Sequence, residues 1–275
     1  MKRWGIIVNK KRPDAEAVVA QLVAWMRERK IDAVVESDVS VEGAEKAADC
    51  EVSKYCNMML ALGGDGTILR TVHLMGEHQK PILGINLGSL GFLTETSQAE
   101  MWKTLESVDS GRYRTEERAM ALAECGGVQY HALNDLDIRV PTRLIELTVE
   151  VDKEFLNRYY ADGLLVATPT GSTAYSLAAG GPVVSPEVSA LVITPISPHM
   201  LTHRPVVVKD SRTVKILVIG TPEEAFLTVD GQVGIRVFEG DHISCKKSNR
   251  EVRLLRHADR TFFDVLRMKL KWGER

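Results

Sequence analysis

The sequence predicts two domains, an α/β domain followed by an all-β domain. Through the first third of the 275 residues, short apolar runs alternate with stretches in which apolar residues recur every third or fourth position. From about residue 119 this rhythm gives way to short runs in which apolar and polar residues alternate. The first pattern is typical of strands and helices that build a parallel sheet, and the second of half-buried antiparallel strands.

The first domain is predicted to contain a Rossmann-like parallel sheet with helices on its faces. The expected strands are the apolar runs at residues 4–8, 33–35, 58–62 and 82–85. Residues 14–29 form the expected first helix, because their apolar side chains fall on one stripe. A second helix is expected after a glycine turn, where Ile68, Leu69, Val72 and Met75 repeat at helical spacing.

The second domain is predicted to be a sandwich-like stack of antiparallel strands that holds one short helix, residues 172–179. Residues 145–151 alternate strictly, and shorter runs follow at 206–208, 214–219, 226–229, 235–238 and 252–255. The tail, residues 261–272, is predicted to be a helix that returns to the first domain. We therefore expect one domain at 1–118 together with 257–275, and the other at 119–256.

Composition excludes several classes of protein. Apolar residues make up 44% and charged residues 26%, which is typical of a folded globular chain. Because 35 Lys and Arg nearly balance 37 Asp and Glu, neither nucleic acid nor an anionic membrane is an expected partner. No segment approaches the roughly 18 apolar residues of a membrane helix. Four scattered cysteines favour free thiols, so we expect a cytoplasmic protein.

Two strand-to-loop junctions carry the chemistry. The first is Leu62-Gly63-Gly64-Asp65-Gly66-Thr67, where glycines permit positive φ and let backbone N–H groups approach an anion at the start of a helix. The second begins at Asp162 and runs through a hydroxyl- and glycine-rich loop, residues 168–181. No Gly-x-x-x-x-Gly-Lys-Ser/Thr loop is present, so a kinase of this sequence is not of the P-loop type.

This pair of junctions closely resembles the NAD kinase family, which phosphorylates NAD to NADP. The resemblance extends to residues 84–94, 133–135, 194–199, Arg204-Pro205 and 230–232. It implies an enzyme that transfers a phosphoryl group from ATP, or from another donor such as polyphosphate, to the 2′-hydroxyl of the adenosine ribose of NAD. It also implies a homodimer or homotetramer. The glycine turn alone also resembles those of lipid kinases and phosphofructokinases, so a lipid or other small-molecule kinase is one alternative, and a silent NAD(P)-binding sensor is the other.

The resemblance assigns roles to individual residues. It makes Asp65 the base that acts on the ribose hydroxyl, with Gly66 beside the substrate; the alternative for Asp65 is a helix cap. Arg70 lies one helical turn further on and faces the same phosphates, or else solvent. Asn134 and Asp135 bind the dinucleotide through ribose hydroxyls or the adenine edge, or else form a turn.

The remaining expected contacts are with the dinucleotide. By resemblance its pocket is lined by Asp162, Thr173, Ala174, Tyr175, Ser176, Leu177 and Ala178. Arg143 is expected near the new 2′-phosphate, and Gln232 is either a pocket amide or part of a turn. Because Asp65 and Asp162 belong to different domains, we expect the dinucleotide to bind between them. No His, Cys or carboxylate spacing predicts a protein metal site, so a divalent cation, Mg²⁺ by preference, is expected to arrive with ATP.

Overall fold

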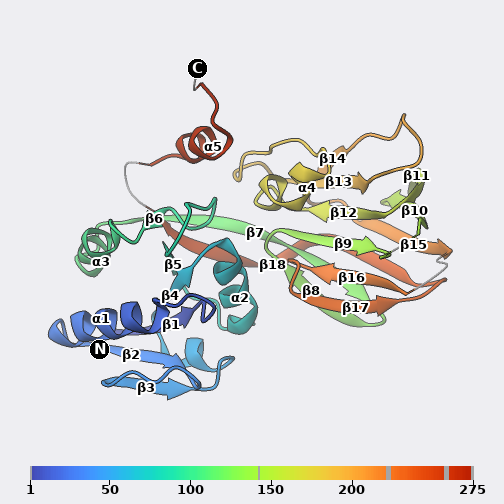
Figure 1. Ribbon diagram of the computed structural model, residues 1–275. Coiled ribbons are helices and arrows are strands. Elements are labelled where there is room, and N and C mark those ends of the chain that lie inside the picture. Colours follow the sequence, from blue (N-terminus) through green and yellow to red (C-terminus); the bar gives the residue numbers. More distant parts are fainter. Residues whose placement is uncertain (1, 142, 221–223, 257–259, 274–275) are drawn as a thin grey trace. The chain divides into compact units, whose positions relative to one another are not determined.

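The computed structural model describes residues 2–141, 143–220, 224–256 and 260–273. The chain divides into two compact units, each described here by itself (Figure 1). The α/β unit comprises residues 1–117 and 252–275, and the β unit residues 118–251. The expected boundaries at 118/119 and 256/257 differ from these, because β18 (His242–Arg256) is one continuous strand whose last residues, from Val252, lie in the α/β unit.

The α/β unit is built on a parallel sheet in the order β3-β2-β1-β4-β5. The last residues of β18 extend it, because Leu254 pairs in parallel with Ile82. The elements are β1 (Lys2–Val8), α1 (Ala15–Glu28), β2 (Ile31–Glu36), β3 (Ala44–Ala47), η1 (Val52–Tyr55), β4 (Met58–Gly63), α2 (Asp65–Met75), β5 (Ile82–Asn86), β6 (Thr96–Ser97), α3 (Met101–Asp109) and α5 (Phe262–Leu270).

Helices cover both faces of this sheet. Alternate residues of β1 and β4 pack in one cluster with α1 and α3. On the opposite face α2 approaches closely enough that a Cβ on Gly84 would press into Ile68. The predicted strands and the helix at 14–29 are confirmed, since the period-3.6 stripe of α1 is buried. The predicted return of the C-terminal helix is also confirmed: α5 belongs to this unit, and Lys269 Nζ donates to the Leu90 carbonyl at 2.6 Å.

The β unit is a sandwich of two antiparallel sheets around one core. One sheet has the order β14-β13-β12-β9-β16-β17, and the other joins β11-β10-β15 to the first part of β18. The elements are β7 (Arg114–Cys125, which begins in the α/β unit), β8 (Val128–Ala132), β9 (Asp135–Arg139), β10 (Ile145–Val151), β11 (Glu154–Ala161), β12 (Gly163–Ala167), η2 (Gly171–Thr173), α4 (Tyr175–Ala178), β13 (Ala190–Ile196), β14 (Val206–Lys209), β15 (Val214–Gly220), β16 (Ala225–Val229) and β17 (Val233–Val237).

The predicted helix at 172–179 is wrong as a single helix. The segment forms the 3₁₀ turn η2 and the four-residue helix α4, separated by Ala174 with φ −100° and ψ −128°. The break follows from local polar chemistry. Ser172 Oγ donates to the Pro169 carbonyl at 2.6 Å and accepts from Val184 N–H at 2.9 Å, and such side-chain bonds compete with the helical ladder.

No helix among the described residues is both long and apolar enough to span a membrane.

Candidate active site

A cleft of about 460 Å³ lies at the carboxyl ends of β1 and β4. Connections leave these two strands in opposite directions along the sheet, and ligands of open α/β sheets bind at such switch points. The walls come from residues 8–11 after β1 and from the glycine turn and first turn of α2: Val8, Asn9, Lys10, Lys11, Gly64, Gly66, Thr67 and Arg70. Three cations therefore surround the amino end of α2, where an anion is favoured.

Gly63 has φ +158°, whereas Gly64 and Gly66 act through the absence of a side chain rather than through positive φ. Gly64 has φ −117° and ψ −167°, and Gly66 lies inside α2, so the expectation of positive φ is wrong at both. A Cβ built on either residue would meet no atom within 4 Å. An anion can consequently approach the backbone of either residue without meeting a side chain.

Asp65, the first residue of α2, turns its carboxylate toward a neighbouring loop. Oδ1 accepts from Leu93 N–H, Thr94 N–H and Thr94 Oγ1, each at 3.0 Å. Oδ2 accepts from Phe92 N–H at 2.8 Å. Gly64 is the helix cap and has no side-chain bond, so the capping alternative for Asp65 does not hold. Since a carboxylate offers about four acceptor sites, Oδ2 keeps one that these bonds do not use.

Two further side chains, Asn86 and Arg256, hold in place the loop that bonds Asp65. Asn86 at the end of β5 accepts from Gly88 N–H at 2.6 Å and donates to Thr94 Oγ1 at 2.9 Å. Arg256, a buried residue, donates to the Leu93 carbonyl at 3.1 Å and pairs with Glu116 at 2.8 Å. Gly91 is required here, because a Cβ at this position would overlap Asp65 Oδ1.

The β unit contains a second, separate cavity of about 420 Å³. It is lined by Asn134, Asp135, Asp137, Arg139, Ala174, Tyr175, Asp230 and Gly231. Asn134 and Asp135 reach it because Asp230 accepts from the N–H groups of Leu133, Asn134 and Asp135 at 2.9, 2.6 and 3.2 Å. The Asp230-Gly231 pair turns the β16–β17 hairpin with φ of +51° and +65°, the geometry of a type I′ turn.

Two carboxyl groups of this cavity have raised pKa values. Burial, and then the charges of Asp230 and Asp137, raises the pKa of Asp135 to about 7. Burial raises the pKa of Asp137 to about 6, against the opposing effect of Arg139, whose Nε lies 3.2 Å from Asp137 Oδ1. A buried carboxyl that gains a proton near neutral pH can donate as well as accept a hydrogen bond, which suits hydroxyl groups of a ligand.

The hydroxyl-rich loop after β12 is bonded mainly to the protein itself. Thr168 Oγ1 donates to the Leu133 carbonyl at 2.6 Å, and Thr173 Oγ1 to the Thr170 carbonyl at 3.1 Å. Arg118 donates to Thr170 Oγ1 at 3.2 Å. Gly171 fits because a Cβ there would overlap the Asn134 carbonyl oxygen. These bonds fix the position of the loop, and Ala174 and Tyr175 at its end line the cavity.

The remaining residues expected to contact the dinucleotide lie outside the lining of the β-unit cavity. Asp162 is exposed, precedes β12, and is not among the residues that line the β-unit cavity. Ser176 is buried and its hydroxyl shares a hydrogen bond with Thr194 at 3.0 Å. Gln232 is exposed and closes the β16–β17 turn through its N–H to the Val229 carbonyl at 2.9 Å. Arg143 lies on an exposed bend before β10.

Leu177 is half-buried and Ala178 exposed in α4, and neither lines the cavity; Thr173 ends η2 beside it. Binding of a dinucleotide between the two domains stays a prediction.

Sequence reasoning missed several residues that line the two cavities. In the cleft these are Asn9, Lys10 and Lys11; in the β unit they are Asp137, Arg139 and Asp230. A signal was present for the first group, since Asn9-Lys10-Lys11 directly follows the strand at 4–8, and carboxyl ends of parallel strands meet at one edge. Asp137 and Arg139 alternate with apolar Leu136 and Ile138, and this period marks them as facing away from the core.

An α/β unit with a cationic cleft over a glycine turn, and a β sandwich with a polar cavity, define a nucleotide-binding phosphotransferase of two units. Residues 4–113 match the ATP-NAD kinase N-terminal domain and residues 135–257 the ATP-NAD kinase C-terminal domain. The chain therefore belongs to the NAD kinase family.

Curated relatives and solved structures agree with this membership. An NAD kinase of Geotalea daltonii is 40% identical over 284 residues, which cover 100% of both chains, and one of Koribacter versatilis is 42% identical over 287 residues, with the same coverage. The yeast NADH kinase crystallised with NADH has a TM-score of 0.92 at 26% identity, covering 100% of this chain and 89% of its own. An Archaeoglobus fulgidus NAD kinase in complex with ATP has a TM-score of 0.78 at 26% identity, covering 96% and 98%.

Proposed function

We propose that the protein transfers a phosphoryl group from ATP to the 2′-hydroxyl of the adenosine ribose of NAD, with Asp65 as the base. Members of its family are phosphotransferases that convert NAD to NADP, and this chain is one of them. One observation carries the assignment of Asp65. Its carboxylate is fixed by four donors from residues 92–94, yet Oδ2 accepts only one of them.

That arrangement suits proton transfer. A base must be held in one orientation and still have an acceptor site for the hydroxyl. In the reaction the hydroxyl proton passes to Asp65 Oδ2 and the ribose oxygen bonds the γ-phosphorus. The bond from phosphorus to the oxygen of ADP breaks, and ADP leaves.

The cleft beside Asp65 is the proposed site of the donor's phosphates. Lys10, Lys11 and Arg70 offer positive charge there, and Gly64 and Gly66 place no side chain in the way of an anion. Mg²⁺ prefers oxygen ligands and few of them from protein. The nearby carboxylates of Glu36 and Asp49 are paired with cations, and the one unused acceptor site of Asp65 is assigned to the ribose hydroxyl, so Mg²⁺ would be held chiefly by the phosphates. The ion would supply neutralisation of phosphate charge.

The cavity of the β unit is the proposed site of the dinucleotide. Asn134, Asp135 and Tyr175 line it, and Asp135 can serve as donor or acceptor to ribose hydroxyls. The expected contacts at Thr173, Ala174, Leu177, Ala178, Asp162, Arg143 and Gln232 remain part of this proposal.

We also propose a homo-oligomer in the cytoplasm. Tyr160, Met200 and Leu201 are exposed hydrophobic residues of the β unit, and His199 N–H bonds the Tyr160 carbonyl at 2.9 Å, so they lie close together. Clustered exposed apolar side chains support a contact between copies. Free thiols at Cys50, Cys56, Cys125 and Cys245 support a reducing compartment.

A coupled assay tests the proposal. The purified protein is incubated with NAD, Mg²⁺ and ATP, and NADP is detected with an NADP-specific dehydrogenase; a parallel reaction replaces ATP with polyphosphate. Formation of NADP with either donor supports a kinase of NAD. Binding of NADP without its formation indicates the sensor, and neither formation nor binding of NADP indicates a lipid or other small-molecule kinase.

A further inference from the structure

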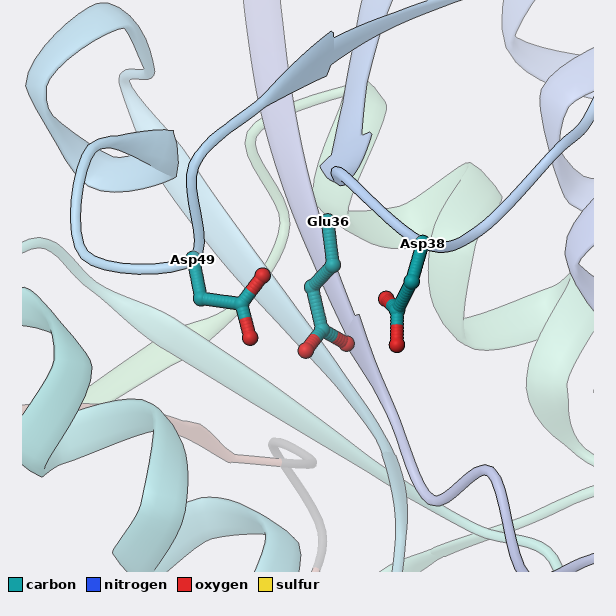
Figure 2. Close-up of side chains that lie close together, drawn as sticks. All are labelled: Glu36, Asp38 and Asp49. Carbon is teal, nitrogen blue, oxygen red and sulfur yellow. The ribbon is translucent and has the colours of Figure 1, made fainter.

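Glu36, the last residue of β2, is a carboxylate buried completely beside the cleft without lining it. Figure 2 shows it between Asp38 and Asp49, which project from the chain on either side. One of its oxygens lies 3.1 Å from Lys10 Nζ and is bonded by Arg70. The other accepts from Val8 N–H at 3.0 Å. A single carboxylate therefore holds one cation from the end of β1 and one from α2.

The burial of Glu36 is compensated by these partners. Desolvation alone would raise the pKa of Glu36, but the bonds from Arg70, Val8 N–H and Lys10 hold it below its usual value. A buried charge without such partners is strongly unfavourable, so Glu36 and the two cations fix one another.

We propose that Glu36 is a positioning residue for the phosphoryl donor: it fixes Lys10 and Arg70 at the cleft so that both meet the phosphates of a nucleoside triphosphate. The inference rests on the proposed function. Glu36 differs in this from its two neighbours. Within the described part of the chain, Asp38 is exposed and forms an ion pair only with Lys10, whereas Asp49 is half-exposed and forms one only with Arg70, at 3.0 Å.

The exposed carboxylates and the buried Glu36 should respond differently when the phosphates of the donor bind. Ion pairs at the surface contribute little and exchange readily, so the phosphates replace Asp38 and Asp49 as partners of the cations. Glu36 cannot leave, and it keeps the two cations in place. The three carboxylates have oxygens within 4.8 Å of one another, a spacing that a metal ion could bridge. Lys10 and Arg70 already supply positive charge to this cluster, so the structure favours cation positioning over metal binding.

The test compares Glu36→Gln with Asp38→Asn and Asp49→Asn, because each removes one negative charge near the cleft. If only net charge matters, all three changes favour an anionic donor and lower the KM for ATP. If Glu36 positions the cations, Glu36→Gln raises the KM for ATP about tenfold, whereas the two Asp variants leave it within about twofold or lower it. The KM for NAD stays unchanged, and kcat at saturating ATP falls by less than about threefold.

A mutant cycle separates positioning from general destabilisation. In a Lys10→Gln/Arg70→Gln background, whose neutral amides can still donate to the buried carboxylate, Glu36→Gln should add nothing further to the KM for ATP, because its effect passes through those two side chains. A further rise of similar size in that background would overturn the proposal. If Glu36→Gln does not fold, the Lys10→Gln/Arg70→Gln protein decides alone: a raised KM for ATP supports the proposal, and a wild-type KM for ATP would overturn it.

Calorimetric measurement of MgADP binding distinguishes a failure of the proposed reaction from a failure of the positioning role of Glu36. If the wild-type protein makes no NADP but Glu36→Gln still weakens MgADP binding about tenfold, the proposed reaction fails and the positioning role stands. If the wild-type protein makes NADP and Glu36→Gln binds MgADP normally, the positioning role fails alone.

Discussion

Replacing Asp65 with Asn changes one atom of a side chain that four hydrogen bonds hold in place. The amide oxygen should take the position of Oδ1, where three donors converge from Leu93 and Thr94. The amide nitrogen then takes the position of Oδ2 and faces the N–H of Phe92, which is also a donor. The variant consequently loses one hydrogen bond, places two donors together, and has no acceptor for the ribose proton.

The magnitudes of the two effects differ. An unsatisfied donor pair costs about 1–3 kcal/mol, and this cost falls on the local stability of the loop at residues 92–94. Loss of a general base costs roughly 10²–10⁴-fold in rate. We therefore expect single-turnover NADP formation by Asp65→Asn to fall at least about 10²-fold, with a small decrease in melting temperature and NAD binding largely kept.

Thr94→Val is the matched control, because it removes one donor to Asp65 Oδ1 and leaves the carboxylate intact. It should loosen the same loop by about 1 kcal/mol and slow the reaction by less than tenfold. Single-turnover rates, NAD dissociation constants and melting curves are measured for both variants. The assignment of Asp65 as base is refuted if Asp65→Asn turns over at nearly the wild-type rate, or if both variants slow equally.

Three further predictions concern Gly91, Asp135 and Asp162. Gly91→Ala should displace the loop, since the new methyl group overlaps Asp65 Oδ1, and kcat should fall at least tenfold; unchanged kcat contradicts this. The folded-state pKa of Asp135, about 7, lies above its usual value of 3.8, so its contribution to stability is complete below about pH 4 and is lost as pH rises through 7. The gain in stability from Asp135→Asn should therefore be larger at pH 8 than at pH 5, by at most about 3 kcal/mol in denaturant unfolding; parallel pH profiles contradict this. Asp162→Ala should weaken NAD binding and shrink the rise in melting temperature on adding NAD, while the unliganded protein changes by less than about 0.5 kcal/mol, because the side chain is exposed. Lower unliganded stability with intact NAD affinity would make Asp162 a structural turn residue.

Local periodicity was sufficient to predict the fold class and most of the elements. The stripe at residues 14–29 and the alternation at 145–151 each reflect one buried face, so the sequence alone identifies α1 and β10. The segment 172–179 failed because its outcome depends on hydroxyl bonds to distant backbone, such as Ser172 to Val184, which no periodicity reports.

The candidate site was predictable in part. The resemblance to a known family identified Asp65, and physical reasoning placed it beside an anion-binding turn. Its partners at residues 92–94 lie 27–29 positions away along the chain, and Glu36 lies 34 positions from Arg70. Contacts at such separations are set by the order of strands in the sheet, which one sequence does not specify.

Asp65 has two roles, as the proposed base and as the acceptor that fixes the loop at residues 92–94. This combination bears on how such proteins would lose their activity in evolution. A descendant no longer selected for phosphoryl transfer would still be selected to keep this carboxylate, because three backbone amides depend on it. Lys10 and Arg70 instead pair with side-chain carboxylates beside the cleft, the buried Glu36 among them. Replacement of those cations together with Glu36, rather than of the aspartate, is the change that would mark a lineage that has turned from making NADP to merely sensing it.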